Sequence, residues 1–209
     1  MELIQSFKDP YFDKVNDTMK KWIPIFKSVF IDDQKNRILG YGFTKKGWKE
    51  QQKIDAQNLK IVTAFLDKYK WPTINDVGIF GQRTIGIVIQ HAPLQIQEKY
   101  YPYLVDAYKK DPQLFETLAL LEDRINVSNN RFQYYGTQLA YYKGEQVLYP
   151  VYNIDSLETW RKRIGFKISI ENYFKLLRSN WNIQEYKSML PDLINNFKVT
   201  NEMGIHYNF

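Results

Sequence analysis

The chain contains 209 residues, of which 44% are hydrophobic and 16% aromatic, a composition that favours a folded protein with a substantial core over a disordered one. The absence of cysteine excludes disulfides, thiol catalysis and thiolate metal sites, and two histidines are too few for a multi-histidine metal site. The net charge of +6 raises nucleic acid as a partner, but the lysines are scattered in the manner of a solvated surface, which argues against it.

No apolar stretch is long enough to span a membrane, and the first ten residues lack the basic start and the apolar run of a signal peptide. We therefore expect a cytoplasmic protein with no membrane association. No repeat and no linker divides the sequence, so a single domain is predicted over residues 1–209.

Helical periodicity organises the first half of the chain. Apolar side chains recur at helical spacing in four stretches, at residues 24–37, 46–69, 81–90 and 94–108. The first is expected to stop by Gly40, and the third fits a buried strand as well, although a helix is favoured. Residues 73–81 are predicted to form a glycine-punctuated loop. Asp111 is predicted to cap a further helix that starts at Pro112 and reaches about Ile125.

The period changes after Ser128. Residues 132–142 are rich in aromatic rings and read as extended, and a turn at 143–145 separates them from the apolar stretch 147–151, so this part predicts a β-hairpin. Further helices are predicted from Asp155 or Ser156 to Arg163 with a capping box completed by Glu158, from Ser169 to Leu177, and over 183–197 with an interruption near Pro191.

The predicted fold is therefore mostly α, a single-domain helical bundle with one antiparallel β-hairpin. Residues 178–209 are expected to form a C-terminal helical extension, although no clear period follows Thr200.

Several polar residues fall on stripes that should face the core. Asp33 continues the apolar face of the first helix, and Arg37 lies one turn further on, where the carboxylate and the guanidinium can meet. The other residues of this kind are Asp55, Asn58, His91, Asp123 and Arg124. Burying an unpaired ion costs several kcal/mol, so these groups must pair, meet water or line a cleft. Each one alone is explained as a salt bridge or a cap, but their number indicates a site.

The hairpin contributes the run Gln133-Tyr134-Tyr135-Gly136-Thr137-Gln138. Gly136 weakens the interior of a strand, so its presence suggests a bulge or the close approach of another group. An ordinary amphipathic strand with packed rings explains the run equally well.

The polar residues also belong to an ordered set of short motifs. In chain order these are Asp33-Gln34 with Arg37, Asp55 with Asn58, Trp71-Pro72, Val77-Gly78, Gln90-His91, Leu121 with Asp123-Arg124, Gln133 with Tyr135-Gly136-Thr137-Gln138, and Arg161 to Gly165 with Tyr173. The set resembles the uncharacterised bacterial family catalogued as domain of unknown function 6624, over roughly residues 30–177. Lys70 departs from the pattern, because a glycine commonly precedes Trp-Pro there. The family has no established activity, so the resemblance implies no reaction.

The first functional hypothesis is a pocket for a small anionic or polar ligand. His91 is the one candidate side chain whose ordinary pKa suits general acid/base work near neutral pH, and Asp123 or Asp55 would orient it. The ligand would be bound by side chains of the motif set, namely Asp33, Gln34, Arg37, Asp55, Asn58, Gln90, Arg124, Tyr135, Thr137 and Gln138. No nucleophile motif and no phosphate-binding loop is present, so the sequence leaves open the reaction type and whether the protein is an enzyme.

The second hypothesis is a non-catalytic module that binds a protein partner, because tyrosine and tryptophan are enriched at contact hot spots. A third interpretation treats the inward polar residues as a closed structural network. No metal and no cofactor is predicted in any of these cases.

Overall fold

The structure, a computed structural model, describes residues 9–38, 44–200 and 202–207. The fold is mostly α with one antiparallel β-hairpin, which confirms the predicted class. The chain divides into two compact units, Met1–Leu114 and Phe115–Phe209, and each is described by itself. The expectation of a single domain stays a prediction.

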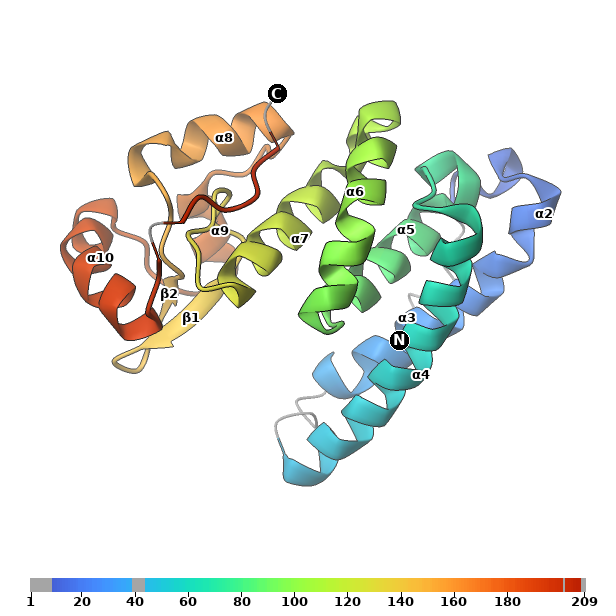
Figure 1. Ribbon diagram of the computed structural model, residues 1–209, viewed down its shortest axis with the longest axis horizontal. Helices are drawn as coiled ribbons and strands as arrows, with labels where there is room; N and C mark the ends of the chain where they lie inside the picture. Colours follow the sequence, from blue (N-terminus) through green and yellow to red (C-terminus); the bar gives the residue numbers. More distant parts are fainter. Residues whose placement is uncertain (1–8, 39–43, 201, 208–209) are drawn as a thin grey trace. The chain divides into compact units, whose positions relative to one another are not determined.

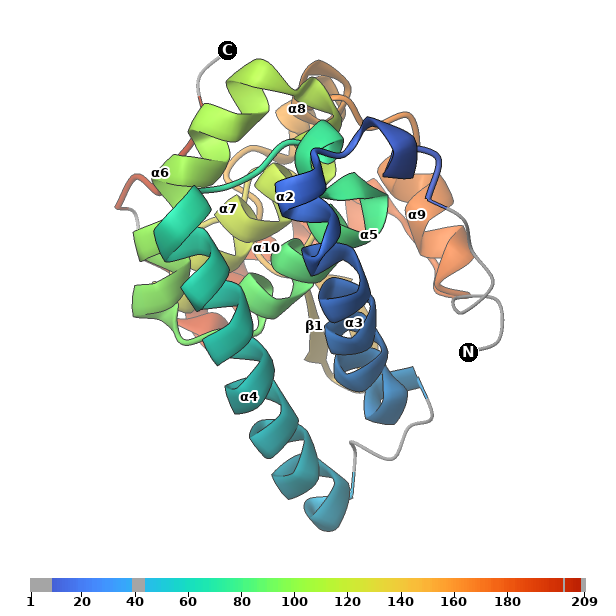
Figure 2. The same ribbon diagram turned by 90° about the vertical axis from the view of Figure 1, so that its right-hand side faces the viewer.

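The first unit is helical (Figure 1). Its elements are η1 (Phe12–Lys14), α2 (Asp17–Lys20), α3 (Trp22–Ile38), α4 (Lys45–Tyr69), α5 (Ile74–Gln90), α6 (Leu94–Lys110) and η3 (Pro112–Leu114). Helices α3 and α4 run side by side, and both pack against α5 (Figure 2). The rings of Phe26 and Phe65 meet edge to face at 5.1 Å in the core between them. Apolar periodicity therefore located these helices, whereas the expected stop at Gly40 lies outside the described residues.

The prediction of a loop over residues 73–81 was wrong, because α5 already begins at Ile74. The carboxylate of Asp76 accepts the backbone N–H of Thr73 at 2.7 Å and its hydroxyl at 2.8 Å, which fixes the first turn. Gly78 has a φ of 72° and bends the helix, and a Cβ there would collide with the carboxylate of Asp9. Gly78 thus marks a kink within the helix.

The second unit contains the hairpin and the remaining helices. Its elements are α7 (Phe115–Ser128), β1 (Leu139–Tyr142), β2 (Glu145–Leu148), η4 (Ile154–Ser156), α8 (Leu157–Ile164), α9 (Ile170–Leu176) and α10 (Ile183–Phe197). The strands pair antiparallel, with Leu139 opposite Leu148. The first strand is shorter than predicted, because the backbone of residues 133–138 bonds largely to side chains.

Two further details of this unit differ from the sequence-based prediction. Helix α10 runs through Pro191 without a break, and this proline lies exposed on its surface. The capping box with Glu158 was wrong, because Asn153 instead caps the η4 turn that precedes α8. Glu158 accepts the N–H of Ile170 at 2.7 Å and so ties α8 to the start of α9. The expected C-terminal extension is helical only as far as α10.

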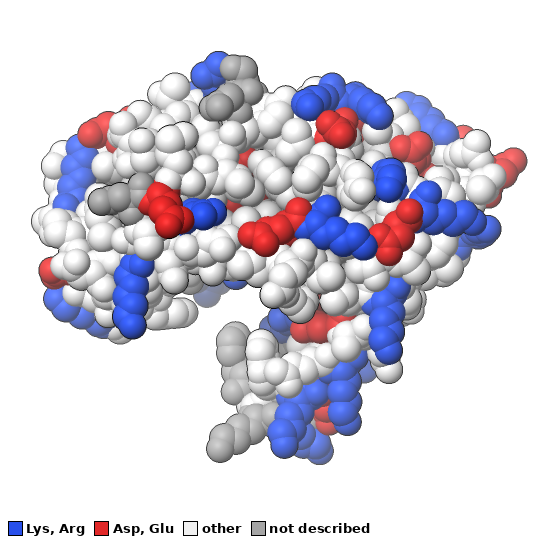
Figure 3. All heavy atoms as spheres, in the orientation of Figure 1, with Lys and Arg blue, Asp and Glu red and all other residues white. Residues whose placement is uncertain are grey.

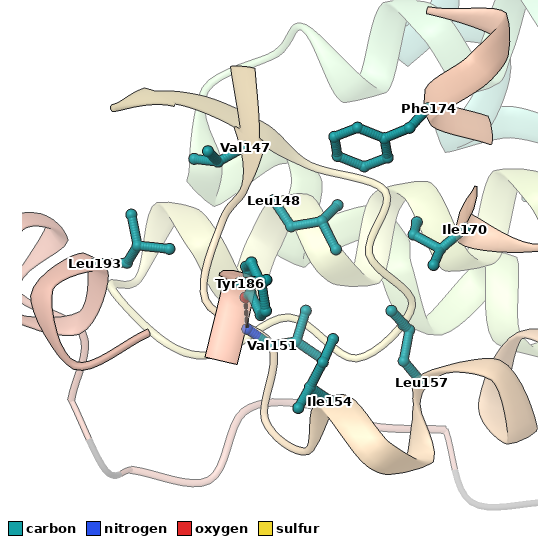
Figure 4. Close-up of a cluster of buried hydrophobic side chains, with 9 residues drawn as sticks. All are labelled: Val147, Leu148, Val151, Ile154, Leu157, Ile170, Phe174, Tyr186 and Leu193. Carbon is teal, nitrogen blue, oxygen red and sulfur yellow. Dashed lines mark hydrogen bonds between the residues drawn. The ribbon is translucent and has the colours of Figure 1, made fainter. Parts of the chain in front are cut away.

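A cluster of apolar side chains forms the core of the second unit (Figure 4). It consists of Val147, Leu148, Val151, Ile154, Leu157, Ile170, Phe174, Tyr186 and Leu193. The hydroxyl of Tyr186 lies inside this cluster, where it accepts the N–H of Val151 at 3.0 Å and donates to the carbonyl of Tyr149 at 3.2 Å. One hydroxyl thus satisfies two backbone groups beside the hairpin.

Two surface properties bear on partners. Within the described ranges, no helix is both long enough and apolar enough to cross a membrane. On the face drawn in Figure 3, lysine and arginine side chains alternate with aspartate and glutamate on each unit. This mixing agrees with the interpretation of the basic residues as solvated surface.

Tyr186→Phe should lower the free energy of unfolding by about 1–3 kcal/mol, because it removes the partner of a buried N–H. In a protein of this size about 1 kcal/mol corresponds to about 2–4 °C in Tm, which calorimetry resolves. The matched control is Tyr141→Phe, whose side chain is 74% exposed and which should leave Tm unchanged. Equal melting temperatures for the two variants would contradict this role of the hydroxyl.

Candidate functional site

Four charged or titratable side chains of the first unit form one network. The carboxylate of Asp33 on α3 is 1% exposed, and its Oδ1 lies 3.3 Å from Nδ1 of His91 at the end of α5. Arg37, one helical turn further along α3, places Nε 3.5 Å from the other oxygen of Asp33. Its Nη2 donates to both oxygens of Asp55 on α4, at 2.8 and 2.9 Å. Arg37 therefore bridges two carboxylates from neighbouring helices.

The electrostatics of this network favour an ionised Asp33. Burial acts to raise the pKa of the Asp33 carboxyl, but the hydrogen bond from His91, the positive charge of Arg37 and the hydrogen bond from Gln34 hold that pKa below its usual value. An ionised carboxylate can only accept, so Nδ1 of His91 carries the hydrogen that faces Asp33. In the neutral imidazole, Nε2 is then the nitrogen with the lone pair.

The other predicted residues of this unit support the network. Gln34 donates to Asp33 at 2.7 Å, and the buried Asn58 donates to the carbonyl of Val29 at 3.3 Å, so it ties α4 to α3. Gln90 precedes His91, and its carbonyl accepts the side chain of Gln97 at 3.1 Å. These contacts are structural.

A cleft of about 440 Å³ opens beside the network. It is lined by Asp33, Trp48, Gln52, Asp55, Ala56, Leu59, Val88, His91, Ala92 and Pro93. Trp48 is 52% exposed, which is unusual for a tryptophan, and it offers a flat apolar wall. The residues that line this cleft combine a proton-transfer group, two carboxylates and an apolar surface.

Sequence reasoning missed three residues of this region. Trp48 and Gln52 line the cleft, and Gln51 is fully buried and donates to Asp55 at 2.7 Å. Gln51 lies one helical turn before Asp55, so the i, i+4 spacing could have revealed it. Trp48 carried no such signal, because its exposure depends on the fold.

The predicted polar residues of the second unit form a separate network around Asp123. This carboxylate is fully buried and accepts the backbone N–H groups of Tyr134, Tyr135 and Thr137 at 2.8 to 3.2 Å, and the hydroxyl of Thr137 at 2.9 Å. Gln138 donates to the carbonyl of Leu120 on α7 at 3.4 Å. The network holds the segment 133–138 on α7, and these bonds occupy both oxygens of Asp123.

Gln133 and Gly136 complete this arrangement. The side chain of Gln133 donates to the carbonyls of Gln138 and Tyr149 and accepts the N–H of Gln138 at 2.8 Å. Gly136 has a φ of 65°, and a Cβ there would come within 3.3 Å of Leu157, so the close approach expected at this glycine is confirmed.

Two arginines of this unit differ in their contacts. Arg161 is buried, and its guanidinium donates to the carbonyls of Tyr135 at 2.7 Å and Ile168 at 3.1 Å. It lines, with Thr137 and others, a second cavity of about 310 Å³. Arg124, in contrast, makes no hydrogen bond or ion pair within the part of the chain that the structure describes, and burial lowers its pKa.

The predicted site residues thus fall into two groups. Those of the first unit are Asp33, Gln34, Arg37, Asp55, Asn58, Gln90 and His91, and those of the second are Asp123, Arg124, Tyr135, Thr137 and Gln138. The described contacts link most members within each group, and the convergence of both groups in one site stays a prediction. The orienting contact to His91, expected from Asp123 or Asp55, comes from Asp33.

No metal site accompanies these networks in the described ranges, where no three His, Cys, Asp or Glu side chains are placed to hold an ion together. Arg37 already neutralises part of the charge of the two carboxylates beside the cleft.

Residues 43–185 match the family described as "Family of unknown function (DUF6624)", and this match covers more than half of the chain. The chain belongs to this family. The resemblance inferred from the motifs is therefore confirmed, although the matched segment begins later and ends later than the motifs indicated. No curated protein and no solved structure matches the chain.

The DUF6624 segment contains all the predicted site residues except three. Asp33, Gln34 and Arg37 precede it on α3, whereas His91 and Asp55 lie inside it. The orienting carboxylate of His91 is thus supplied from outside the matched segment.

The Asp123 network makes stability depend on pH. Burial raises the pKa of this carboxyl to about 6, because lost hydration outweighs the N–H donors. Since the pKa in the folded state exceeds the ordinary value of 3.8, stability is lost as the pH rises from about 4 to 6. Asparagine at position 123 does not titrate. Between pH 4 and 7 the free energy of unfolding of the wild type should therefore fall by about 1–3 kcal/mol relative to that of Asp123→Asn.

Urea unfolding of both proteins at each pH measures the difference. A difference in the free energy of unfolding that is the same at every pH would contradict the raised pKa.

Proposed function

We propose that the cleft beside His91 binds a small polar molecule and that Nε2 of His91 exchanges a proton with it. The observation that carries this proposal is the contact between His91 and the buried carboxylate of Asp33 at 3.3 Å. A carboxylate that accepts from one imidazole nitrogen fixes the orientation and tautomer of the ring, which leaves the other nitrogen for acid/base work. The position of His91 in the cleft wall supports the same function.

The charges of the network favour a neutral or cationic ligand over an anionic one. Asp33 and Asp55 share the single guanidinium of Arg37, so with a neutral His91 the network carries a net negative charge. Trp48 supplies an apolar or cation-binding face. The ligand class is therefore a small molecule with a hydroxyl or amine and an apolar part.

The chemistry is direct proton transfer with no covalent intermediate on the protein. Three groups in the cleft wall can act as nucleophiles, and all three are otherwise engaged in this proposal. Arg37 holds the carboxylates of Asp33 and Asp55, and His91 carries the proton transfer. His91 would accept a proton from a ligand hydroxyl, an amine or a water molecule and return it afterwards. This reaction needs no metal, and elemental analysis of purified protein that finds one equivalent of zinc or iron would overturn that part of the proposal.

A structural network is the second candidate role, and it applies to the residues around Asp123. Fixed backbone donors occupy both oxygens of that carboxylate, which favours a scaffold over a reactive group. The cytoplasmic location expected from the sequence stays a proposal.

His91→Gln should abolish ligand binding at the cleft while it shifts Tm by no more than about 2–4 °C, because glutamine keeps size and hydrogen-bonding capacity but does not titrate. A thermal-shift panel of amines, amino acids, sugars and nucleosides identifies ligands of the wild type, and calorimetry then gives their Kd. Arg83→Gln, an exposed change on the same helix α5, is the matched control and should bind as the wild type does.

Trp48 provides a local readout, since a ligand in the cleft should change its fluorescence and Trp48→Phe should remove that change. Equal affinity of wild type and His91→Gln for every ligand found would overturn the proposal. A drop in Tm several times larger than expected would assign His91 to structure instead.

A further inference from the structure

After α10 the chain runs back along α7, within the second unit (Figure 1). The backbone N–H of Thr200 donates to the carbonyl of Asn130 at 2.8 Å, and Glu202 forms an ion pair with Arg131 at 3.0 Å. Residues 202–207 have no helical or strand structure, so their backbone groups need other partners. Two buried side chains of α7 supply several of them.

Asn126 binds both backbone groups of a single residue. Its side chain is fully buried, its Nδ2 donates to the carbonyl of Ile205 at 2.9 Å, and its Oδ1 accepts the N–H of Ile205 at 2.9 Å. This pair of hydrogen bonds binds the backbone of the residue at position 205, whatever side chain that residue has. A Cβ at Gly204 would come within 2.5 Å of Oδ1 of Asn126, so only glycine fits before the bound residue.

Glu122, one helical turn before Asn126, provides the second contact point. It is fully buried, its Oε1 lies 3.0 Å from Nδ1 of His206, and its Oε2 accepts the N–H of Tyr207 at 3.1 Å. The imidazole of His206 stacks on the ring of Tyr134 at 4.0 Å, with the ring of Trp160 at 5.8 Å. These contacts select a histidine two positions after the glycine.

The residues that bind the segment lie inside the DUF6624 match, whereas the bound segment lies beyond its end at residue 185. Within the segment Met203 is 77% exposed, whereas residues 204–207 are partly buried and the side chain of His206 is only 17% exposed. Polar contacts to two buried side chains and the stacked imidazole therefore hold the segment, which belongs to no helix or strand.

We propose that Glu122, Asn126, Tyr134 and Trp160 form a recognition groove for an extended peptide with the pattern Gly-any-His. Residues 202–207 are the built-in occupant of this groove. A hollow of about 310 Å³ beside the segment, lined by Tyr134, Tyr152, Trp160, Arg163, Met203, Gly204 and His206, leaves room for the side chains of a longer peptide. The site is separate in its residues from the cleft at His91.

The built-in occupant should mask the groove. A tethered segment acts at an effective concentration in the millimolar range, so a free peptide of the same sequence binds poorly until the segment is displaced. Gly204→Ala in the full chain should displace it through the clash with Asn126.

The probe is a fluorescein-labelled synthetic peptide of residues 199–207, and the measurement is its anisotropy with the full chain. We expect Gly204→Ala to bind the peptide at least tenfold more tightly than the wild type or the control Asn196→Ala, an exposed change on α10. Peptides with alanine in place of Gly204 or of His206 should bind at least tenfold more weakly. If Gly204→Ala fails to fold, Ile205→Pro serves instead, because it removes the N–H that Asn126 accepts.

Amide hydrogen exchange of Ile205 and Tyr207 reports displacement independently, since both N–H groups are bonded to buried side chains, and in Ile205→Pro the amide of Tyr207 alone serves. Faster exchange in the variant together with tight peptide binding supports the groove. Faster exchange without a gain in peptide affinity, or equal affinity for the alanine-substituted peptides, overturns it. Binding of a second copy in place of the peptide, seen as a dimer by size exclusion, would also overturn the assignment to a free peptide.

Discussion

A carboxylate removed from water must receive hydrogen bonds or a positive charge, and this constraint arranges both units of the protein. In the second unit the buried Asp123 receives N–H groups from three residues of one segment, and these bonds hold the segment on α7. Its position then sets the start of β1 and the carbonyl that Arg161 binds. The hairpin and α8 are thus organised around a single ionisable group.

The first unit satisfies its buried carboxylate differently. Asp33 is met by side chains, and two of them, those of Arg37 and His91, also carry or acquire charge. Backbone donors are fixed by the fold, whereas an imidazole can gain and lose a proton without moving the chain. The Asp33 network therefore contains a partner that can exchange a proton, whereas the backbone partners of Asp123 only hold the segment in place. This contrast, more than the number of polar residues, distinguishes a candidate site from a scaffold.

Sequence patterns predicted most of the helices and the hairpin, because both depend on the period of apolar residues. These patterns failed where one residue type occurs in two kinds of local structure. Gly78 was interpreted as part of a loop and instead bends α5, and Pro191 was interpreted as a break and lies on the surface of a continuous helix. Of the polar residues placed on inward faces, Asp33, Asn58 and Asp123 are buried. The others, namely Arg37, Asp55, His91 and Arg124, are partly exposed, and the roles of all seven depend on partners that spacing does not reveal. Asn58 and Asp123 are structural in their contacts, and His91 lines a cleft.

Residues 202–207 mark the limit of such prediction. The contacts between Glu122 or Asn126 and this segment join residues about 80 positions apart, through single side chains without any repeat. Glu122 and Asn126 also differ in whether their partners are side chains or backbone groups, as Asp33 and Asp123 do. Asn126 binds the backbone of Ile205 and leaves room only for glycine at position 204, and Glu122 adds selectivity through an imidazole. A groove that binds both the backbone and one particular ring is more selective than packing of the chain end requires. This selectivity is the physical reason to expect a peptide ligand there.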